Sequence, residues 1–163
     1  MVLSVNLLYA QQPQQFVKCF IGMNKSQVKN YWETRVNEAC FQDEIPTSFK
    51  VLALNCENSS GGIDYNTLNV NTPAFEAVFD SLKGICVYQK LKLLPQQFSV
   101  VKAQLRNTGY VYDESHNLWT NEQKKVIWKI SDVWTNVSND GTDRYRYIEC
   151  FKYTKELIGN SSK

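Results

Sequence analysis

The sequence predicts an α+β protein built from two tandem units, each a helix followed by about four antiparallel strands. Two helix patterns occur in the chain, alternating apolar segments follow each of them, and turns rich in Gly, Asn and Asp separate those segments. The 163 residues suffice for one domain or for two small units that share a core. We expect the units at 11–91 and 92–155, after a short leader at 1–10 and before a polar tail at 156–163.

The first helix is expected to begin after Asn24, which is a favourable N-cap residue. Gln27 stands where its side chain can reach back and complete a capping box. Apolar and aromatic residues then recur at helical spacing and form one stripe that faces the core. These residues are Val28, Tyr31, Trp32 and Val36.

Strand patterns follow the first helix. Ranges 49–54 and 63–70 are rich in apolar residues, and the loop between them holds Asn, Ser and Gly. Ranges 74–79 and 85–91 form a predicted hairpin, because Gly84 supplies the flexible residue that its turn requires.

The pattern restarts at Pro95, which is suited to the first turn of a helix. Phe98, Val101 and Leu105 form the apolar stripe of this second helix, and Gly109 ends it. Strands are expected afterwards, separated by polar turns at 113–117 and 138–141. Their ranges are 110–112, 118–120, 125–134 and 144–153.

Composition narrows the function classes. The net charge of +2 is spread along the chain without blocks, so we expect no nucleic-acid partner. No apolar run approaches the ~20 residues of a membrane span, so we expect no integral membrane segment. Four Trp, nine Tyr and eight Phe make the chain rich in residues that favour β-sheet and binding surfaces.

The first ten residues resemble the end of a secretory signal peptide, because an apolar run ends at Ala10 and polar, Pro-containing sequence follows. The basic segment of a signal peptide is missing, which indicates a start further upstream. On this interpretation export removes 1–10, and the protein is periplasmic or secreted. Alternatively, residues 2–9 form an apolar strand of a cytoplasmic domain.

The cysteines are Cys19, Cys40, Cys56, Cys86 and Cys150. They show no Cys-x-x-Cys spacing, and the single histidine, His116, is distant in sequence, so we expect no metal site. Cys40 and Cys56 flank one connection and are the predicted disulfide in an oxidising compartment. Alternatively, all five cysteines are small buried apolar residues.

No catalytic signature is evident. Asp43–Glu44 and Asp113–Glu114 are adjacent pairs in loops, where neighbouring side chains diverge and are solvated. Asp113, Ser115 and His116 are too close in sequence to adopt the geometry of a hydrolytic triad easily. We therefore expect no enzyme activity and no cofactor.

Aromatic residues of the last strand are the candidate binding residues. Alternation places Tyr145, Tyr147, Phe151 and Tyr153 on one face, and Arg144 and Arg146 on the other. Trp128 and Trp134 belong to the same half of the chain. An aromatic sheet face with flanking Arg is typical of a protein-contact surface. Alternatively, this face packs on the second helix.

The segment 20–28, Phe-Ile-Gly-Met-Asn-Lys-Ser-Gln-Val, resembles the Gly-Met-Thr-x-x-Gln-Val opening of a family of helix-plus-sheet modules. This family includes the secreted β-lactamase inhibitory protein and the small lipoprotein of the outer-membrane β-barrel assembly machinery. The resemblance implies tandem helix-plus-sheet units, a disulfide soon after the helix and an extracytoplasmic setting, but not enzyme inhibition. Asn24 replaces the usual Thr, and the range 95–104 lacks the motif.

The sequence thus favours an extracytoplasmic, non-enzymatic module that binds a protein partner through an aromatic sheet face. The alternative is a small enzyme or ligand-binding domain whose site is assembled from loops. A deep pocket lined by buried titratable groups would favour the enzyme.

Overall fold

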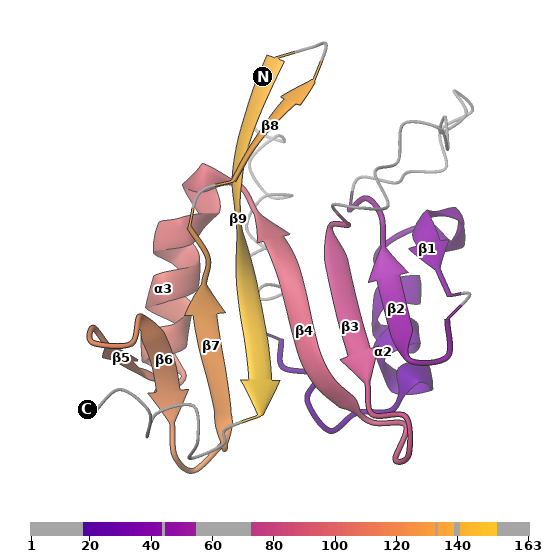
Figure 1. The fold of residues 1–163 in the computed structure, drawn as a ribbon, viewed down its shortest axis with the longest axis horizontal. Coiled ribbons are helices and arrows are strands. Elements are labelled where there is room, and N and C mark those ends of the chain that lie inside the picture. The colour runs from indigo at the N-terminus through magenta and orange to yellow at the C-terminus, as the bar shows by residue number, and fades with distance from the viewer. Residues whose placement is uncertain (1–17, 44, 55–72, 133, 139–140, 153–163) are drawn as a thin grey trace, which may run out of the picture. The chain divides into compact units, whose positions relative to one another are not determined.

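The structure is a computed structural model that describes residues 18–43, 45–54, 73–132, 134–138 and 141–152. It confirms the α+β class, because the described residues form two α-helices and mostly antiparallel sheet (Figure 1). The chain divides into two compact units. One comprises 20–92 and 149–152, and the other comprises 1–19, 93–148 and 153–163.

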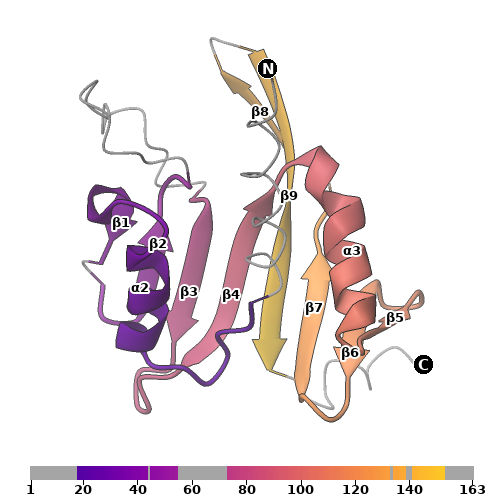
Figure 2. The ribbon, with the colours of Figure 1, turned by 180° about the vertical axis from the view of Figure 1, so that it is seen from behind.

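The 20–92 unit contains one helix that lies over one face of its sheet (Figure 2). Its strands run in the order β1-β2-β3-β4, and the last residues of β9 follow beside β4. The registers described for β1–β2, β2–β3 and β3–β4 are all antiparallel. The elements are α2 (Lys25–Glu33), η1 (Glu38–Cys40), β1 (Phe41–Gln42), β2 (Ser48–Val51), β3 (Phe75–Phe79) and β4 (Cys86–Leu93).

Helix α2 begins at the predicted capping box. The backbone N–H of Gln27 donates to Asn24 Oδ1 at 2.9 Å, and the N–H of Asn24 donates to Gln27 Oε1 at 2.9 Å. These two bonds satisfy donors that the first helical turn leaves without helical partners. Val28 and Trp32 are buried as expected, whereas the helix ends at Glu33, so Val36 is buried outside it.

The core of this unit is aromatic. The Trp32 and Phe75 rings lie 4.8 Å apart, and Phe20 packs edge-on against Phe75 at 5.3 Å. A buried amide joins this cluster to β4, because Gln89 Oε1 accepts from the Phe20 N–H at 2.6 Å. Helix and sheet are therefore held by rings that Trp32 contributes from α2 and Phe75 from β3.

The predicted hairpin at 74–91 is confirmed as β3 and β4. In its turn, Asp80 Oδ1 accepts from the N–H groups of Leu82 and Lys83 at 3.0 and 2.7 Å. Gly84 has φ +63, a left-handed conformation that favours glycine. This turn leaves the Leu82 side chain 93% exposed.

The other unit also contains a helix that lies over its sheet (Figure 2). Its strands run in the order β9-β7-β6-β5, and β8 also pairs with β9. Register is antiparallel for β5–β6, β6–β7 and β8–β9. The elements are η3 (Pro95–Gln97), α3 (Phe98–Asn107), β5 (Val111–Asp113), β6 (Leu118–Asn121), β7 (Val126–Ile130), β8 (Trp134–Ser138) and β9 (Gly141–Lys152).

Helix α3 is entered through the 3-10 turn that contains Pro95, and the Leu94 N–H donates to Gln97 Oε1 at 2.8 Å. Val101 and Leu105 are buried, as the stripe predicts. Gly109 ends the helix with φ +84, and a Cβ at this position would lie 3.3 Å from the side-chain amide of Asn121.

Two strand predictions need correction. The predicted strand 125–134 is divided into β7 and the start of β8, with Ser131 and Asp132 outside both. The predicted strand 49–54 is shorter and covers Ser48–Val51. The leader 1–10, the strand 63–70 and the tail 156–163 lie outside the described residues. Within the described ranges, each helix is too short or too polar to cross a membrane.

Candidate functional site

The aromatic face predicted for β9 is largely interior. Tyr145, Tyr147 and Trp128 are only 3%, 8% and 1% exposed. The two tyrosine rings contact each other edge-on at 5.5 Å. These three side chains belong to the core and are not available to a partner, which differs from the exposed face that the sequence suggested.

Strand alternation explains where these residues go. The Arg146 guanidinium lies 4.7 Å from the ring centroid of Phe98, the first residue of α3. Tyr145 and Tyr147 alternate with Arg146, so they lie on the opposite face of β9 from the one that meets α3. Trp128 instead packs on Tyr110, just after α3, with the centroids 6.4 Å apart. Tyr145 and Tyr147 thus occupy one interior position, and Trp128 occupies another.

The remaining predicted binding residues have different environments. Register places Trp134 of β8 directly opposite Tyr145, although the Trp134 side chain lies outside the described part. Arg144 is exposed, and Phe151 is half-buried. Tyr153 lies outside the described residues. Of the eight predicted residues, Arg144 is therefore the one whose side chain is seen to be exposed.

The β5–β6 hairpin carries two exposed apolar side chains, one of which is aromatic. Strand β5 stands at the end of its strand order and is paired with β6. Its residue Val111 is 70% exposed, and Tyr112 is 39% exposed. Exposed apolar side chains on a terminal strand are typical of a contact site.

Tyr112 is supported from beneath by buried rings and a cation. Its ring lies 5.1 Å from that of Trp119, its cross-strand neighbour on β6. The Arg106 guanidinium lies 5.5 Å from the same Trp119 ring. Similarly, Lys124 Nζ lies 4.9 Å from the Tyr110 ring and donates to the Thr108 carbonyl at 2.7 Å.

The turn of this hairpin is held by side-chain hydrogen bonds. The Tyr112 hydroxyl donates to Asn117 Oδ1 at 2.8 Å, and Asn117 has the left-handed φ of +53 that Asn tolerates. Asp113 Oδ1 accepts from the N–H of Ser115 at 2.9 Å, and Asp113 Oδ2 lies 2.7 Å from His116 Nδ1. The hairpin is therefore preorganised, and Tyr112 has one preferred position.

Asp113 and His116 hydrogen-bond to each other within the turn. The hydrogen bond from the His116 ring, more than any other contact, holds the pKa of the Asp113 carboxyl below its ordinary value. His116 Nε2 is buried, and no atom of the described residues hydrogen-bonds to it. A general base must reach its substrate, whereas this nitrogen is enclosed by the surrounding chain.

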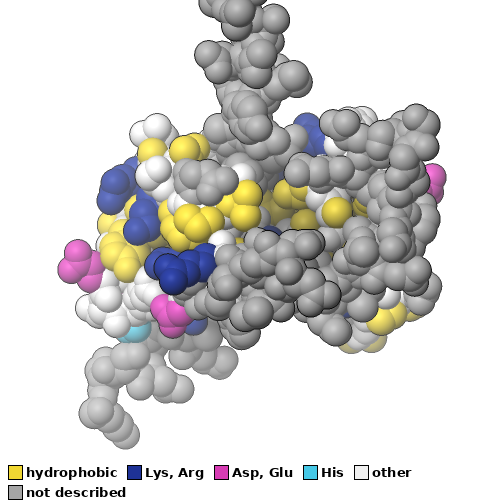
Figure 3. Space-filling model, turned by 90° about the horizontal axis from the view of Figure 1, so that it is seen from above, with side chains coloured by type: hydrophobic (Ala, Val, Ile, Leu, Met, Phe, Trp, Pro, Cys, Tyr) yellow, Lys and Arg dark blue, Asp and Glu magenta, His cyan; other side chains and the backbone are white. Residues whose placement is uncertain are grey.

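The cations near Tyr112 keep their positive charge. Among the described residues no carboxylate forms an ion pair with Arg106 or Lys124. On the side where Figure 1 draws α3 and β5, Figure 3 shows Lys and Arg side chains beside hydrophobic ones. We call Arg106, Val111, Tyr112 and Lys124 the hairpin surface.

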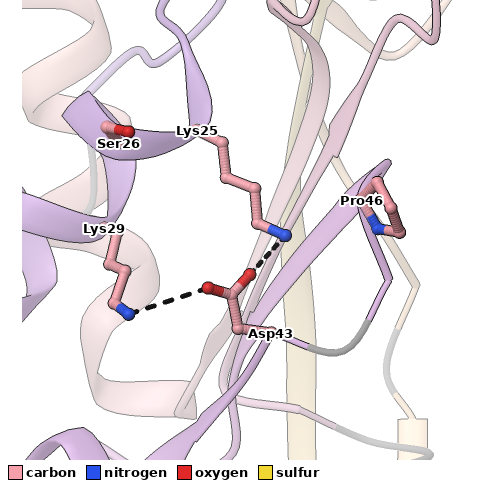
Figure 4. A pocket seen from close by; sticks show the side chains of 5 residues that line it. All are labelled: Lys25, Ser26, Lys29, Asp43 and Pro46. Carbon is pink, nitrogen blue, oxygen red and sulfur yellow. Dashed lines mark ion pairs between the residues drawn. The ribbon is translucent and has the colours of Figure 1, made fainter.

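A surface hollow of about 420 Å³ lies in the other unit, lined by Lys25, Ser26, Lys29, Asp43 and Pro46. Its charges satisfy each other. Lys25 pairs with Asp43 and donates to the Ile45 carbonyl at 2.9 Å, and Lys29 lies 3.7 Å from the second Asp43 oxygen (Figure 4). Lys29 also approaches Glu38 at 3.6 Å. Such mutual pairing stabilises the α2 surface and leaves little unbalanced charge for a ligand.

The cysteines are mostly interior. Cys40 is buried and disulfide-bonded. Cys56 lies outside the described residues, so the Cys40–Cys56 pairing stays a prediction. Cys86 is a buried thiol whose Sγ donates to the Tyr88 carbonyl at 3.3 Å. In the part of the chain that the structure describes, no three His, Cys, Asp or Glu side chains gather to hold a metal ion.

Sequence reasoning missed the hairpin surface because its parts are dispersed. Arg106 lies in the last turn of α3, Tyr112 belongs to a short strand, and Lys124 lies in a turn. The signal available in the sequence was the short strand 110–112, in which the apolar residues Val111 and Tyr112 stand directly before a polar turn.

Comparisons with known proteins leave the chain without a matched relative. No protein-family model matches the sequence, and neither a curated protein nor a solved structure matches it.

Proposed function

We propose that the protein is an extracytoplasmic, non-enzymatic module that binds a protein partner, and that the hairpin surface makes the contact. The exposure of Val111 and Tyr112 on a preorganised hairpin supports this proposal most directly. Aromatic side chains that lose little conformational freedom on binding dominate the energetics of protein interfaces. Tyr112 meets this condition because Trp119 and Asn117 already fix its ring and its hydroxyl.

We propose further that the two compact units are tandem versions of one helix-plus-sheet module. In the described residues, each unit has an α-helix that is followed by antiparallel strands, which supports this proposal. The capping box at Asn24 and Gln27 agrees with the resemblance of 20–28 to the Gly-Met-Thr modules. That resemblance, the signal-like range 1–10 and the disulfide at Cys40 together favour a periplasmic or secreted location.

Binding is tested by comparing capture on the full chain with capture on the Val111→Asp/Tyr112→Ala variant. Extracytoplasmic extract is passed over both proteins, and the retained proteins are quantified. We expect at least one protein to be retained by the unsubstituted chain and reduced about tenfold on the variant, because the exposed apolar contact is lost.

Leu82→Asp is the matched control, since Leu82 is also exposed and apolar but lies at the β3–β4 turn. It should retain the same proteins as the unsubstituted chain. Equal retention on all three proteins, with their folding verified by circular dichroism, would contradict the proposal.

A further inference from the structure

We infer that the hairpin surface accepts an acidic, extended segment of the partner, which adds to the sheet as a strand beside β5. This inference rests on the proposed function, because it names the chemistry of the partner that the same surface would bind. Three features of the described residues carry it: the side of β5 opposite β6, two cations that form no ion pair with a described carboxylate, and the exposed side chains of Val111 and Tyr112.

The first feature is the backbone of β5. Within the described residues β5 pairs with β6 alone and ends its strand order. A terminal strand directs part of its N–H and C=O groups away from the sheet, where an extended peptide can pair with them. Val111 is 70% exposed, so the face of β5 that carries its side chain is open to solvent.

The second feature is the charge. Arg106 and Lys124 lie over aromatic rings, and no carboxylate of the described residues forms an ion pair with either of them. Asp113 at the end of β5 is paired with His116, and Glu114 and Glu122 are exposed in the turns on either side of β6. A ring attracts a cation through its quadrupole but carries no net charge, so the positive charge remains. An approaching carboxylate would therefore be attracted, and an approaching lysine would be repelled.

The third feature is the position of these groups relative to one another. Arg106 and Tyr112 both contact Trp119, and Lys124 contacts Tyr110, which directly precedes β5. An added strand would place alternate side chains over Tyr112, where acidic residues also come near Arg106. Apolar residues of the other face would meet Val111. A segment of alternating acidic and apolar residues fits this arrangement.

Fluorescence anisotropy with three labelled peptides tests the inference on the full chain. The first peptide alternates Glu and Val, the second alternates Lys and Val, and the third is the Glu–Val peptide N-methylated at the residues that would donate to β5. We expect the Glu–Val peptide to bind about tenfold more tightly than either of the others. The Arg106→Glu/Lys124→Glu variant should reverse the preference between Glu–Val and Lys–Val.

If this variant unfolds, Arg106→Gln/Lys124→Gln should abolish the preference instead. Equal binding of the Glu–Val and N-methylated peptides would overturn strand addition. Equal binding of the Glu–Val and Lys–Val peptides would overturn the acidic partner, and no binding at millimolar peptide would overturn both. If one of these results is obtained but the extract experiment retains a partner through the hairpin surface, the proposed function stands and only the further inference fails. If the peptide binds but the extract experiment retains no partner, only the proposed function fails.

Discussion

The two units place their cations differently. In the 20–92 unit, Lys25 and Lys29 meet Asp43, and Lys50 and Lys90 meet Glu76. The other unit instead positions its cations over rings, in the pairs Arg106–Trp119, Lys124–Tyr110 and Arg146–Phe98.

The consequence is a difference in net local charge. An ion pair cancels the charge of both partners, whereas a cation over a ring keeps its charge and its attraction for anions. Arg35 over Tyr31 shows that the 20–92 unit also contains one contact of the second kind. The comparison therefore separates a unit whose described surface lysines are paired with carboxylates from one whose cations lie over rings and keep their charge available to a partner.

The largest expected effect concerns the aromatic core of the 20–92 unit. Trp32→Ala removes a fully buried ring that contacts Phe75, and we expect a loss of about 3–5 kcal/mol of unfolding free energy. Urea denaturation measures it. Partner capture by the molecules that stay folded should not change. If the variant keeps its stability but no longer captures the partner, the interface lies on α2 and the distinction drawn between the two units is wrong.

The second-largest effect on stability is expected from reduction of the disulfide at Cys40. If Cys40 pairs with Cys56, reduction should cost about 3 kcal/mol, because an open connection gives the unfolded chain more conformations. Peptide mapping without reductant identifies the pair, and thermal unfolding with and without reductant measures the effect. Recovery of Cys40 linked to a different cysteine would refute the predicted pairing.

The two helix starts should differ by a smaller amount. Asn24→Ala removes a capping box and should cost about 1 kcal/mol. Gln97→Ala, which removes one side-chain bond to the Leu94 N–H, is the matched change at the start of α3 and should cost less. Chemical denaturation of both variants gives the comparison, and an equal or reversed order would contradict it.

These helix starts also show what the sequence could predict. Asn24 and Gln27 make their bonds within one helical turn, so local sequence was sufficient to place α2. The hairpin around Gly84 was equally accessible, since a turn needs only its own residues. The burial of Tyr145 and Tyr147 could not be predicted, because strand alternation assigns a side chain to a face of the sheet but does not say what covers that face. Likewise, only strand pairing and the packing of α3 bring together Tyr112, Trp119 and Arg106.

A further comparison uses the ion-paired carboxylate of the sheet. Glu76 lies between Lys50 and Lys90 on adjacent strands, at 3.9 and 3.2 Å. Glu76→Gln should cost about 0.5–1 kcal/mol in low salt, because two lysines on one face then lack their shared partner. High salt should reduce the difference. Lys83→Gln, at an exposed turn, serves as the control and should have no measurable effect on the denaturation midpoint.

The smallest effect concerns pH and the β5–β6 turn. The His116 hydrogen bond lowers the pKa of Asp113, so folding favours the ionised carboxylate. This contribution is fully present above the ordinary carboxyl pKa of 3.8 and is lost as pH falls through the lower folded value. Asp113→Asn should therefore weaken the turn near neutral pH and match the unsubstituted chain in strong acid. Hydrogen exchange of the turn amides measures this, and a pH-independent difference would contradict it.

Strand β9 has a consequence for biosynthesis. Its residues 149–152 belong to the 20–92 unit, and Glu149 accepts from the Tyr88 hydroxyl at 2.6 Å. The ribosome must therefore add the residues up to 152 before the 20–92 unit has all the described strands of its sheet. Domains usually fold in the order of their synthesis, but this unit must wait for residues that are encoded after most of the other unit. A nascent chain stopped before β9 would leave β4 without this neighbour and exposed to aggregation.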